Sequence, residues 1–342
     1  MSGQYSPRHG VYTVGDSWGG DAARRRIVVP ENRETLPGES VTIAEVLRDA
    51  GYATACIGKW NLGTARDPEH NPTGQGFDEF RHYRRMGFRD GYFDAPETQG
   101  GRYSTDVLFD ETIDFVRSRR DGPFFVFLAP DAVHTPLEAP ADAIARAETR
   151  GLSGDAAVYA AMVERVDAGM GRLMTALDEL GLTERTIVVF TSDNGGDVSD
   201  NAPLKGKKGL LYEGGVRVPL IMAGPQIQPG TRSSTPANSV DLYPTLVALT
   251  GVSQPVGHKL DGTDLRPALA GRSQQRGPMF FHFPAYIGQG EPSAAIRDGD
   301  WKLLRLYESQ RDELYNLADD PGETTDLTAT RPEVAARLAG LL

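Results

Sequence analysis

Residues 186–196 read TIVVFTSDNGG, and this stretch decides the fold. Its first five residues form a continuous β-branched and aromatic run, which is typical of a strand buried in a parallel sheet. Asp193 and Asn194 follow where that strand ends, and ligands of open α/β sheets gather beyond the carboxyl ends of the strands. Their side-chain oxygens are ligands of the kind that Ca²⁺ or Mg²⁺ prefers. The stretch predicts a metal site, with a plain turn as the alternative because Asp-Asn and Asn-Gly are common turn pairs.

Helical and strand patterns alternate outward from this stretch. Helices are predicted at 42–50, 104–118 and 156–180, and they precede apolar strands at 53–57, 124–128 and 186–190. This order predicts an α/β domain with a mostly parallel sheet flanked by helices. A further strand is predicted at 218–223, a helix at 240–249 and an irregular loop at 87–103.

The pattern changes after Gly271. Short strands are predicted at 279–283, 294–297 and 301–306, separated by turn residues, and a helix is predicted at 332–341. This part of the chain therefore reads as a small α+β domain with an antiparallel sheet. We expect one domain at 1–271 and a second at 272–342.

Composition excludes several classes of protein. The chain has 342 residues, and its 47 acidic against 36 basic residues give a net charge of −11. No Lys/Arg run offers a nucleic-acid footprint, which disfavours nucleic-acid binding. No apolar run approaches the roughly 20 residues that a membrane span needs. The single cysteine, Cys56, lies in an apolar run and is expected to be a small buried hydrophobe.

Further motifs carry a family resemblance. They read IGKWNLG at 57–63, VHTP at 133–136, KGKKGLLYEGGVRVP at 205–219 and ELYNLADDPGE at 313–323. Together with the DNG of 193–195, and in this order, they make the chain resemble the formylglycine-dependent sulfatases of the alkaline-phosphatase-like superfamily. The resemblance implies an alkaline-phosphatase-like fold and hydrolysis of sulfate monoesters. A sulfated small molecule or glycan is the expected substrate, and a periplasmic or extracellular location is expected.

The resemblance also implies roles for individual residues. Lys59 and Lys208 match the cations that clamp sulfate oxygens, and a lysine ammonium suits that role as a point charge. His134 matches the contact to the leaving group. Asp193 and Asn194 match half of a divalent-cation site, with Ca²⁺ expected before Mg²⁺.

The resemblance also implies which residues lie on the substrate side and which brace the loop that carries the lysines. Trp60 and His282 match positions on the substrate side. Glu213 and Arg217 are expected to brace the loop that carries Lys208.

The chain departs from the family pattern at three places. Asn61 stands where the family has histidine, and an amide can hydrogen-bond but cannot take up a proton near neutral pH. Residues 284–286, PAY, lack another family histidine. Residues 2–11 resemble the segment that follows the nucleophile, so the formylglycine, the first strand and the first Asp-Asp metal pair are expected upstream of Met1.

Plainer interpretations stay open for each candidate. Lys59 could lay its aliphatic stem on Trp60, and His134 could cap a turn. Lys208 could belong to a surface cluster of lysines, and His282 could be a half-buried strand residue.

Two other functions also stay open. One is a phosphomonoester or phosphonate hydrolase of the same superfamily. The other is a non-catalytic, carbohydrate-binding remnant, which the missing nucleophile and Asn61 favour. The sequence does not indicate an oligomeric state.

Overall fold

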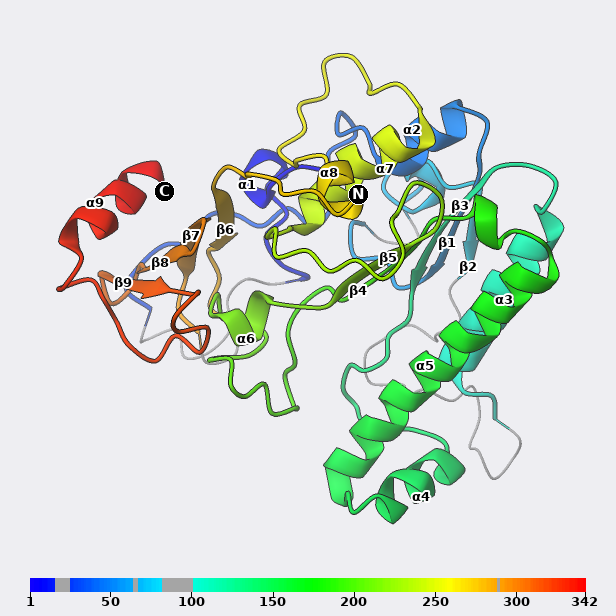
Figure 1. The fold of residues 1–342 in the computed structure, drawn as a ribbon, viewed down its shortest axis with the longest axis horizontal. Helices are drawn as coiled ribbons and strands as arrows, with labels where there is room; N and C mark the ends of the chain where they lie inside the picture. Colours follow the sequence, from blue (N-terminus) through cyan, green and yellow to red (C-terminus); the bar gives the residue numbers. More distant parts are fainter. Residues whose placement is uncertain (16–24, 64–66, 82–100, 288–289) are drawn as a thin grey trace. The chain divides into compact units, whose positions relative to one another are not determined.

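The computed structural model describes residues 1–15, 25–63, 67–81, 101–287 and 290–342 (Figure 1). The chain divides into two compact units, of which one comprises Thr42–Thr186 and the other combines Met1–Val41 with Ile187–Leu342. Most of the predicted loop at 87–103 lies outside the described residues. The domain boundary predicted at 271 stays a prediction.

The unit Thr42–Thr186 is built on a parallel sheet. Its strands are β1 (Ala53–Gly58), β2 (Glu79–Arg81) and β3 (Phe124–Ala129), in the order β2-β1-β3. Both strand pairs are parallel, which confirms the order predicted for the first two apolar strands. The central strand β1 is apolar because both of its faces are covered, and Ala55 and Ile57 are completely buried.

The described residues of this unit include the helices α2 (Ile43–Asp49), α3 (Ser104–Ser118), α4 (Ala141–Thr149) and α5 (Gly154–Glu179). A short 3₁₀ turn spans Thr73–Gln75 and another spans Thr183–Arg185. Helix α2 begins with a capping box, in which the Thr42 hydroxyl accepts from the Glu45 amide and the Glu45 carboxylate accepts from the Thr42 amide. Helix α3 packs Leu108 and Phe115 against β1.

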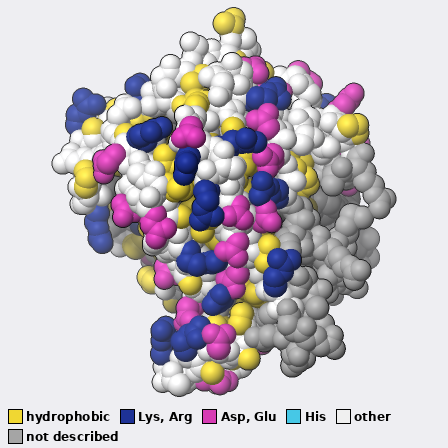
Figure 2. Space-filling model, turned by 90° about the vertical axis from the view of Figure 1, so that its right-hand side faces the viewer, with side chains coloured by type: hydrophobic (Ala, Val, Ile, Leu, Met, Phe, Trp, Pro, Cys, Tyr) yellow, Lys and Arg dark blue, Asp and Glu magenta, His cyan; other side chains and the backbone are white. Residues whose placement is uncertain are grey.

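The outer face of α3, α4 and α5 carries interleaved charges of both signs (Figure 2). Arginines pair with acidic residues of the same or a neighbouring helix: Arg146 with Asp142 and Glu164, Arg165 with Asp106, and Arg172 with Asp110. Such exposed pairs contribute little stability individually. They leave no one-signed basic surface on this face, in agreement with the composition.

The second unit contains two sheets. Strands β4 (Val188–Thr191) and β5 (Leu220–Ala223) form an antiparallel pair in which Phe190 lies opposite Ile221. This antiparallel pair is not expected from the sequence, which predicts parallel order. The described part of this unit also contains the helices α1 (Ser6–His9), α6 (Glu213–Val216), α7 (Leu242–Thr250) and α8 (Arg266–Leu269), with a 3₁₀ turn at Ser239–Asp241.

The C-terminal part of this unit is an antiparallel sheet, as predicted. Its strands β6 (Met279–Phe283), β7 (Ser293–Asp298), β8 (Trp301–Leu306) and β9 (Arg311–Asn316) pair in sequence order. Helix α9 (Pro332–Leu341) covers one face, where Leu338 packs against Ile296 and Leu303. The α/β class with an added antiparallel sheet is therefore confirmed.

The Asp261 carboxylate makes two of the contacts that join the N-terminal segment to the later part of its unit. Asp261 accepts a 2.9 Å hydrogen bond from the Tyr5 amide and pairs with the Arg8 guanidinium. Among the described residues, no helix combines the length and the apolarity that crossing a membrane requires.

Candidate functional site

Lys59 directly follows the carboxyl end of β1. Its amide donates a 2.7 Å hydrogen bond to the carbonyl of Ala129, the last residue of β3, so the sheet pairing extends to the lysine. Gly58 has a φ of 106°, and a Cβ built there would lie 2.2 Å from that same carbonyl oxygen. Only glycine lets the two strand ends approach this closely.

His134 follows the carboxyl end of the neighbouring strand β3. Its amide donates to the carbonyl of Asp131, and its Nδ1 lies 2.7 Å from the carbonyl oxygen of Thr135. A carbonyl can only accept, so Nδ1 carries a proton and Nε2 is the basic atom of the neutral ring. Because β1 and β3 are parallel neighbours, Lys59 and His134 follow the same edge of the sheet.

Trp60 is held by its own surroundings. Its indole N–H donates a 3.0 Å hydrogen bond to the His70 carbonyl, and its ring meets Phe77 edge to face at 5.9 Å between centroids. Phe77 in turn stacks on Phe125 of β3. These contacts favour a structural role for Trp60 that orients the segment of Lys59, and Asn61 lies half-buried next to it.

In the second unit, Asp193 and Asn194 follow the end of β4. The Asn194 amide donates to an Asp193 carboxylate oxygen. The Asn194 side-chain oxygen is buried and accepts no hydrogen bond from any residue that the structure describes. A buried oxygen without a donor is costly, and a cation beside the Asp193 carboxylate would remove that cost.

This pair is an incomplete coordination sphere. Within the described ranges of the chain there is no group of three or more His, Cys, Asp or Glu side chains that could hold a metal ion. Ca²⁺ takes roughly 6–8 oxygen ligands, so Asp193 and Asn194 fit one side of such a site.

Lys208 lies directly behind this turn. Its amide donates a 3.2 Å hydrogen bond to the Gly196 carbonyl, and the Gly195 amide donates to Gly215 of α6. A Cβ built on Gly195 would lie 1.9 Å from the Gly214 carbonyl oxygen, so the turn and α6 are in backbone contact. The structure therefore brings Asp193, Asn194 and Lys208 together.

The three lysines of this loop differ in what their side chains do. Lys205 donates to the Tyr315 hydroxyl at 3.0 Å, with its ammonium 4.1 Å from the centroid of the Tyr212 ring. Lys207 is exposed and donates to the Asp197 carbonyl at 3.3 Å. The Lys208 ammonium makes no hydrogen bond or ion pair with any described residue. Lys208 is thus the member of the cluster that can contact a ligand without breaking an existing contact.

Glu213 braces the loop through a buried ionic group. One of its carboxylate oxygens lies 2.9 Å from the Lys302 ammonium, which is also 2.9 Å from Glu323. Glu323 accepts a 2.6 Å hydrogen bond from the Glu213 amide, and burial raises the pKa of Glu323 despite the Lys302 charge. Arg217 is 55% exposed and 3.8 Å from Glu213, so it contributes less to this bracing.

Glu313 forms a second polar group under the loop. It accepts 2.7 Å and 2.6 Å hydrogen bonds from the hydroxyls of Tyr212 and Tyr315, and it pairs with Arg311. Burial alone would raise its pKa, but these hydroxyls, with the Lys205 and Arg311 charges, outweigh burial and lower it.

His282 lies on β6, away from the contacts described for the lysine loop. Its ring meets Tyr12 edge to face at 5.6 Å and Tyr307 at 6.2 Å, and burial lowers its pKa. Its strand neighbours Phe281 and Phe283 pack against the cluster of Leu211. Successive side chains alternate between the faces of a strand, so His282 belongs to the other face of β6.

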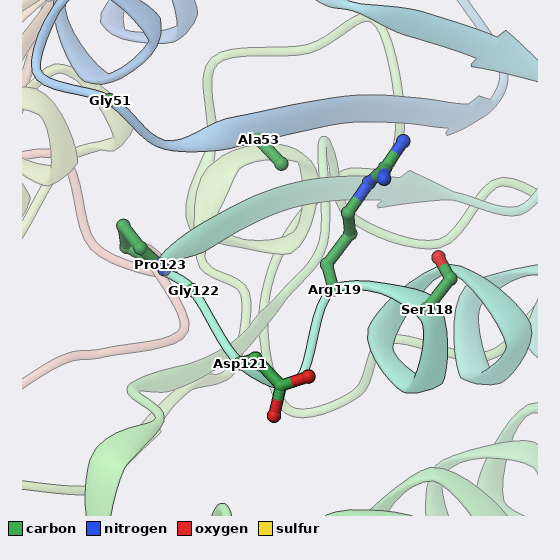
Figure 3. A pocket seen from close by; sticks show the side chains of 7 residues that line it. All are labelled: Gly51, Ala53, Ser118, Arg119, Asp121, Gly122 and Pro123. Atoms are coloured by element: carbon green, nitrogen blue, oxygen red, sulfur yellow. The ribbon is translucent and has the colours of Figure 1, made fainter.

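The pocket in Figure 3 is separate from these candidates. It has a volume of about 240 Å³ and lies at the amino ends of β1 and β3, where Ala53, Gly122 and Pro123 line it. Arg119 and Asp121 also line it, after the end of α3. Lys59 and His134 lie at the opposite, carboxyl ends of these strands.

Sequence reasoning missed four residues that contact the loop of Lys208, namely Asn201, whose side-chain amide donates to the Gly206 carbonyl, and Lys302, Glu313 and Tyr315. Tyr315 and Glu313 lie within the motif at 313–323. That motif marked the segment as part of the family pattern, but it did not indicate which residues these two side chains contact. Lys302 and Asn201 gave no signal, because a lysine in a strand and an asparagine in a loop are ordinary on a surface.

Comparisons with known proteins agree on one family. A family model described as Sulfatase matches residues 1–252, and one described as N-sulphoglucosamine sulphohydrolase, C-terminal, matches residues 206–339. A protein named Sulfatase from Formosa agariphila is 31% identical, over 97% of this chain and 74% of its own length. Human arylsulfatase A is 31% identical, over 92% and 73%.

A solved structure is similar along nearly the whole chain. The structure described as Ps i-CgsB in complex with k-i-k-neocarrahexaose has a TM-score of 0.84 at 30% identity. The similar region covers 99% of this chain and 78% of the chain in that structure. The chain thus spans about three quarters of the length of each of these relatives.

Proposed function

Because this chain belongs to the sulfatase family, we propose that its site serves the hydrolysis of sulfate monoesters, with sulfated glycans as the substrate class. The alkaline-phosphatase-like fold and sulfate-ester hydrolysis follow from family membership. The oligosaccharide complex of the similar Ps i-CgsB supports a glycan as the substrate. The family also supports a periplasmic or extracellular location.

The observation that carries the proposal is the backbone bond between Lys208 and Gly196. This bond holds the backbone of Lys208 against the turn that carries Asp193 and Asn194. A sulfate monoester carries negative charge on its outer oxygens, and its transition state adds charge to the leaving oxygen. A lysine carried next to two oxygen ligands for a metal suits the binding of a sulfate group.

Each remaining residue has a role in this proposal. Lys59 would supply a second cation for the sulfate oxygens. Nε2 of His134 would exchange the proton with the leaving oxygen, because its Nδ1 is held by Thr135. Asn61 would hydrogen-bond the sulfate, while His282 would contact the sugar. Trp60 would hold the segment that carries Lys59 and Asn61 at the edge of the substrate site.

Two groups expected from the family complete the chemistry. A divalent cation, Ca²⁺ rather than Mg²⁺ in our proposal, would be held in part by Asp193 and Asn194 and would neutralise charge on sulfate oxygens. The family nucleophile is a formylglycine. Cys56 is no candidate for it, because this residue is buried in β1 and burial raises the pKa of its thiol to about 12.

The test compares lysine variants of the protein in a form that carries a matured formylglycine. We expect Lys208→Ala to lower kcat/KM on a sulfated sugar by roughly two powers of ten or more, as for loss of an oxyanion donor. Lys59→Ala should act similarly. Lys207→Ala is the matched control and should stay within about twofold of wild type, because its ammonium contacts only an exposed carbonyl. Equal losses in Lys207→Ala and Lys208→Ala would contradict the proposal.

The same assay separates the alternatives. A matched phosphate ester that is hydrolysed faster than the sulfate ester would favour a phosphomonoester or phosphonate hydrolase. Binding of the sulfated sugar without any turnover would favour a carbohydrate-binding remnant. Asn61→His should speed sulfate release or leave it unchanged, since it restores a group that titrates near neutral pH.

A further inference from the structure

The side-chain amide of Asn201 lies where three segments of the candidate site meet. Its Nδ2 is 2.9 Å from the Gly196 carbonyl oxygen, 3.2 Å from that of Gly206 and 3.1 Å from that of Gly214. These carbonyls belong to the metal-side turn, to the loop of Lys208 and to α6. Two N–H groups are thus shared among three acceptors, one on each segment.

The orientation of this amide is fixed by its other end. The Ser199 hydroxyl donates a 3.2 Å hydrogen bond to Oδ1 of Asn201. Carbonyl oxygens on one side and a hydroxyl donor on the other leave one consistent assignment of the amide, with nitrogen toward the three carbonyls. A Cβ built on Gly196 would lie 2.6 Å from Oδ1 of Asn201, so the turn also touches the amide directly.

The same three segments are joined by backbone bonds around Asn201. Lys208 donates to Gly196, Gly195 donates to Gly215, and Gly214 donates to Lys205. These bonds are few and lie in loops, where local opening is cheap. An amide that bonds all three segments at once resists the sliding of any one of them.

We propose that Asn201 is a positioning residue that keeps the Lys208 loop in register with the turn of Asp193 and Asn194. Its contribution to catalysis rests on the proposed function, because it acts through Lys208 and the metal ligands. Its contribution to local order does not.

Hydrogen exchange of this polypeptide gives the first test. In Asn201→Ala, the amides of Gly195, Lys208 and Gly214 should exchange roughly tenfold faster or more, because three carbonyls lose their donor and the loops open more often. Amides in the β8 strand should keep their wild-type rates. Ser199→Ala, which only frees the amide to rotate, should produce a smaller change at the same positions.

The matched control is Asn32→Ala. The Asn32 amide also donates to two backbone carbonyls, those of Thr13 and Gly15, at 3.0 Å and 2.9 Å. This variant should leave exchange at Gly195, Lys208 and Gly214 unchanged. Unchanged exchange in Asn201→Ala would overturn the proposal, and so would acceleration that is uniform over the whole unit.

Calorimetric titration with sodium sulfate supplies a second measurement, the affinity for sulfate. A residue that only stabilised the fold would not affect this affinity. We expect Asn201→Ala to weaken sulfate binding by about fivefold, roughly the loss of one well-placed contact, while Asn32→Ala does not. Unaltered sulfate affinity in Asn201→Ala would overturn the link to the ligand. If Lys208→Ala binds sulfate as wild type does, the proposed role of Lys208 fails, and the exchange pattern alone then decides the role of Asn201.

Discussion

The ammonium group of Lys302 lies 2.9 Å from a carboxylate oxygen of Glu213, and the two side chains are 0% and 3% exposed. Lys302 belongs to β8 and Glu213 begins α6, so this contact joins the C-terminal sheet to the lysine loop. A buried pair adds little over a well-packed apolar pair, yet removal of one partner leaves an uncompensated charge. The contact therefore fixes geometry more than it adds stability.

Removal of the Lys302 charge should be severely destabilising. Lys302→Met removes the ammonium that lies 2.9 Å from both Glu213 and the completely buried Glu323, and we expect a loss of roughly 3–5 kcal/mol in the free energy of unfolding. Urea denaturation measures it. The control is Lys259→Met, the same substitution at an exposed lysine, which should cost less than about 0.5 kcal/mol. A small effect in Lys302→Met would show that the carboxylates are neutral or hydrated.

The close approach of β1 and β3 can be tested at two glycines that both have positive φ. Gly58→Ala places a methyl group 2.2 Å from the Ala129 carbonyl oxygen, whereas Gly51→Ala at φ 88° meets open space. Backbone strain is common to both variants, so their difference reports the clash. We expect Gly58→Ala to lose roughly 1–3 kcal/mol more than Gly51→Ala in urea unfolding. Similar losses would mean that the strand ends can separate at little cost.

His282 should make stability depend on pH. Burial lowers its pKa below the 6.5 of a free imidazole, so the unfolded chain takes up the proton more readily. Its contribution is fully present above pH 6.5 and is lost as the pH falls toward the folded-state pKa. His282→Gln should therefore flatten the decline in unfolding free energy below pH 6.5, measured by urea titration at several pH values.

His9 contributes to the same decline. Its pKa is also lowered, first by burial and then by the charge of the N-terminus. His9→Gln should reduce the decline independently, and the double variant should reduce it further. An unchanged slope in His282→Gln would contradict burial of that ring.

Cys56 should be chemically silent in the folded chain. Burial raises the pKa of its thiol to about 12, so almost no thiolate exists at neutral pH. A disulfide reagent should label the native protein extremely slowly and the urea-unfolded protein completely. Cys56→Ser, which cannot be labelled in either state, gives the background. Fast native labelling would show that β1 opens readily.

Elements whose local pattern agrees with their packing were predictable. Helix α3 has the predicted bounds, because its apolar residues recur at helical spacing and the same residues pack on β1. Strand β9 was missed, since the sequence RDELYN is mostly polar. Its pairing with β8 and the burial of Glu313 between two tyrosines make it a strand, and neither is visible locally.

The residues of the candidate site likewise divide into those that the local sequence pattern predicts and those that it does not. Asp193, Lys59 and His134 follow strand ends, and strand ends can be located from apolar runs. Asn201 could not be assigned, because its function depends on carbonyls that reach it from 5 and 13 residues away along the chain. Lys302 reads as a surface lysine, and only the fold places two carboxylates beside it.

The bond from the Tyr5 amide to Asp261 spans 256 residues, and this separation has a consequence for synthesis on the ribosome. At roughly 5–20 residues per second, Tyr5 emerges about 10–50 s before its partner has been translated. Tyr5 must therefore wait for Asp261 while Thr42–Thr186, which is continuous in sequence, can already collapse. Chaperones or proteases that bind nascent chains would meet the Tyr5 segment before its partner exists.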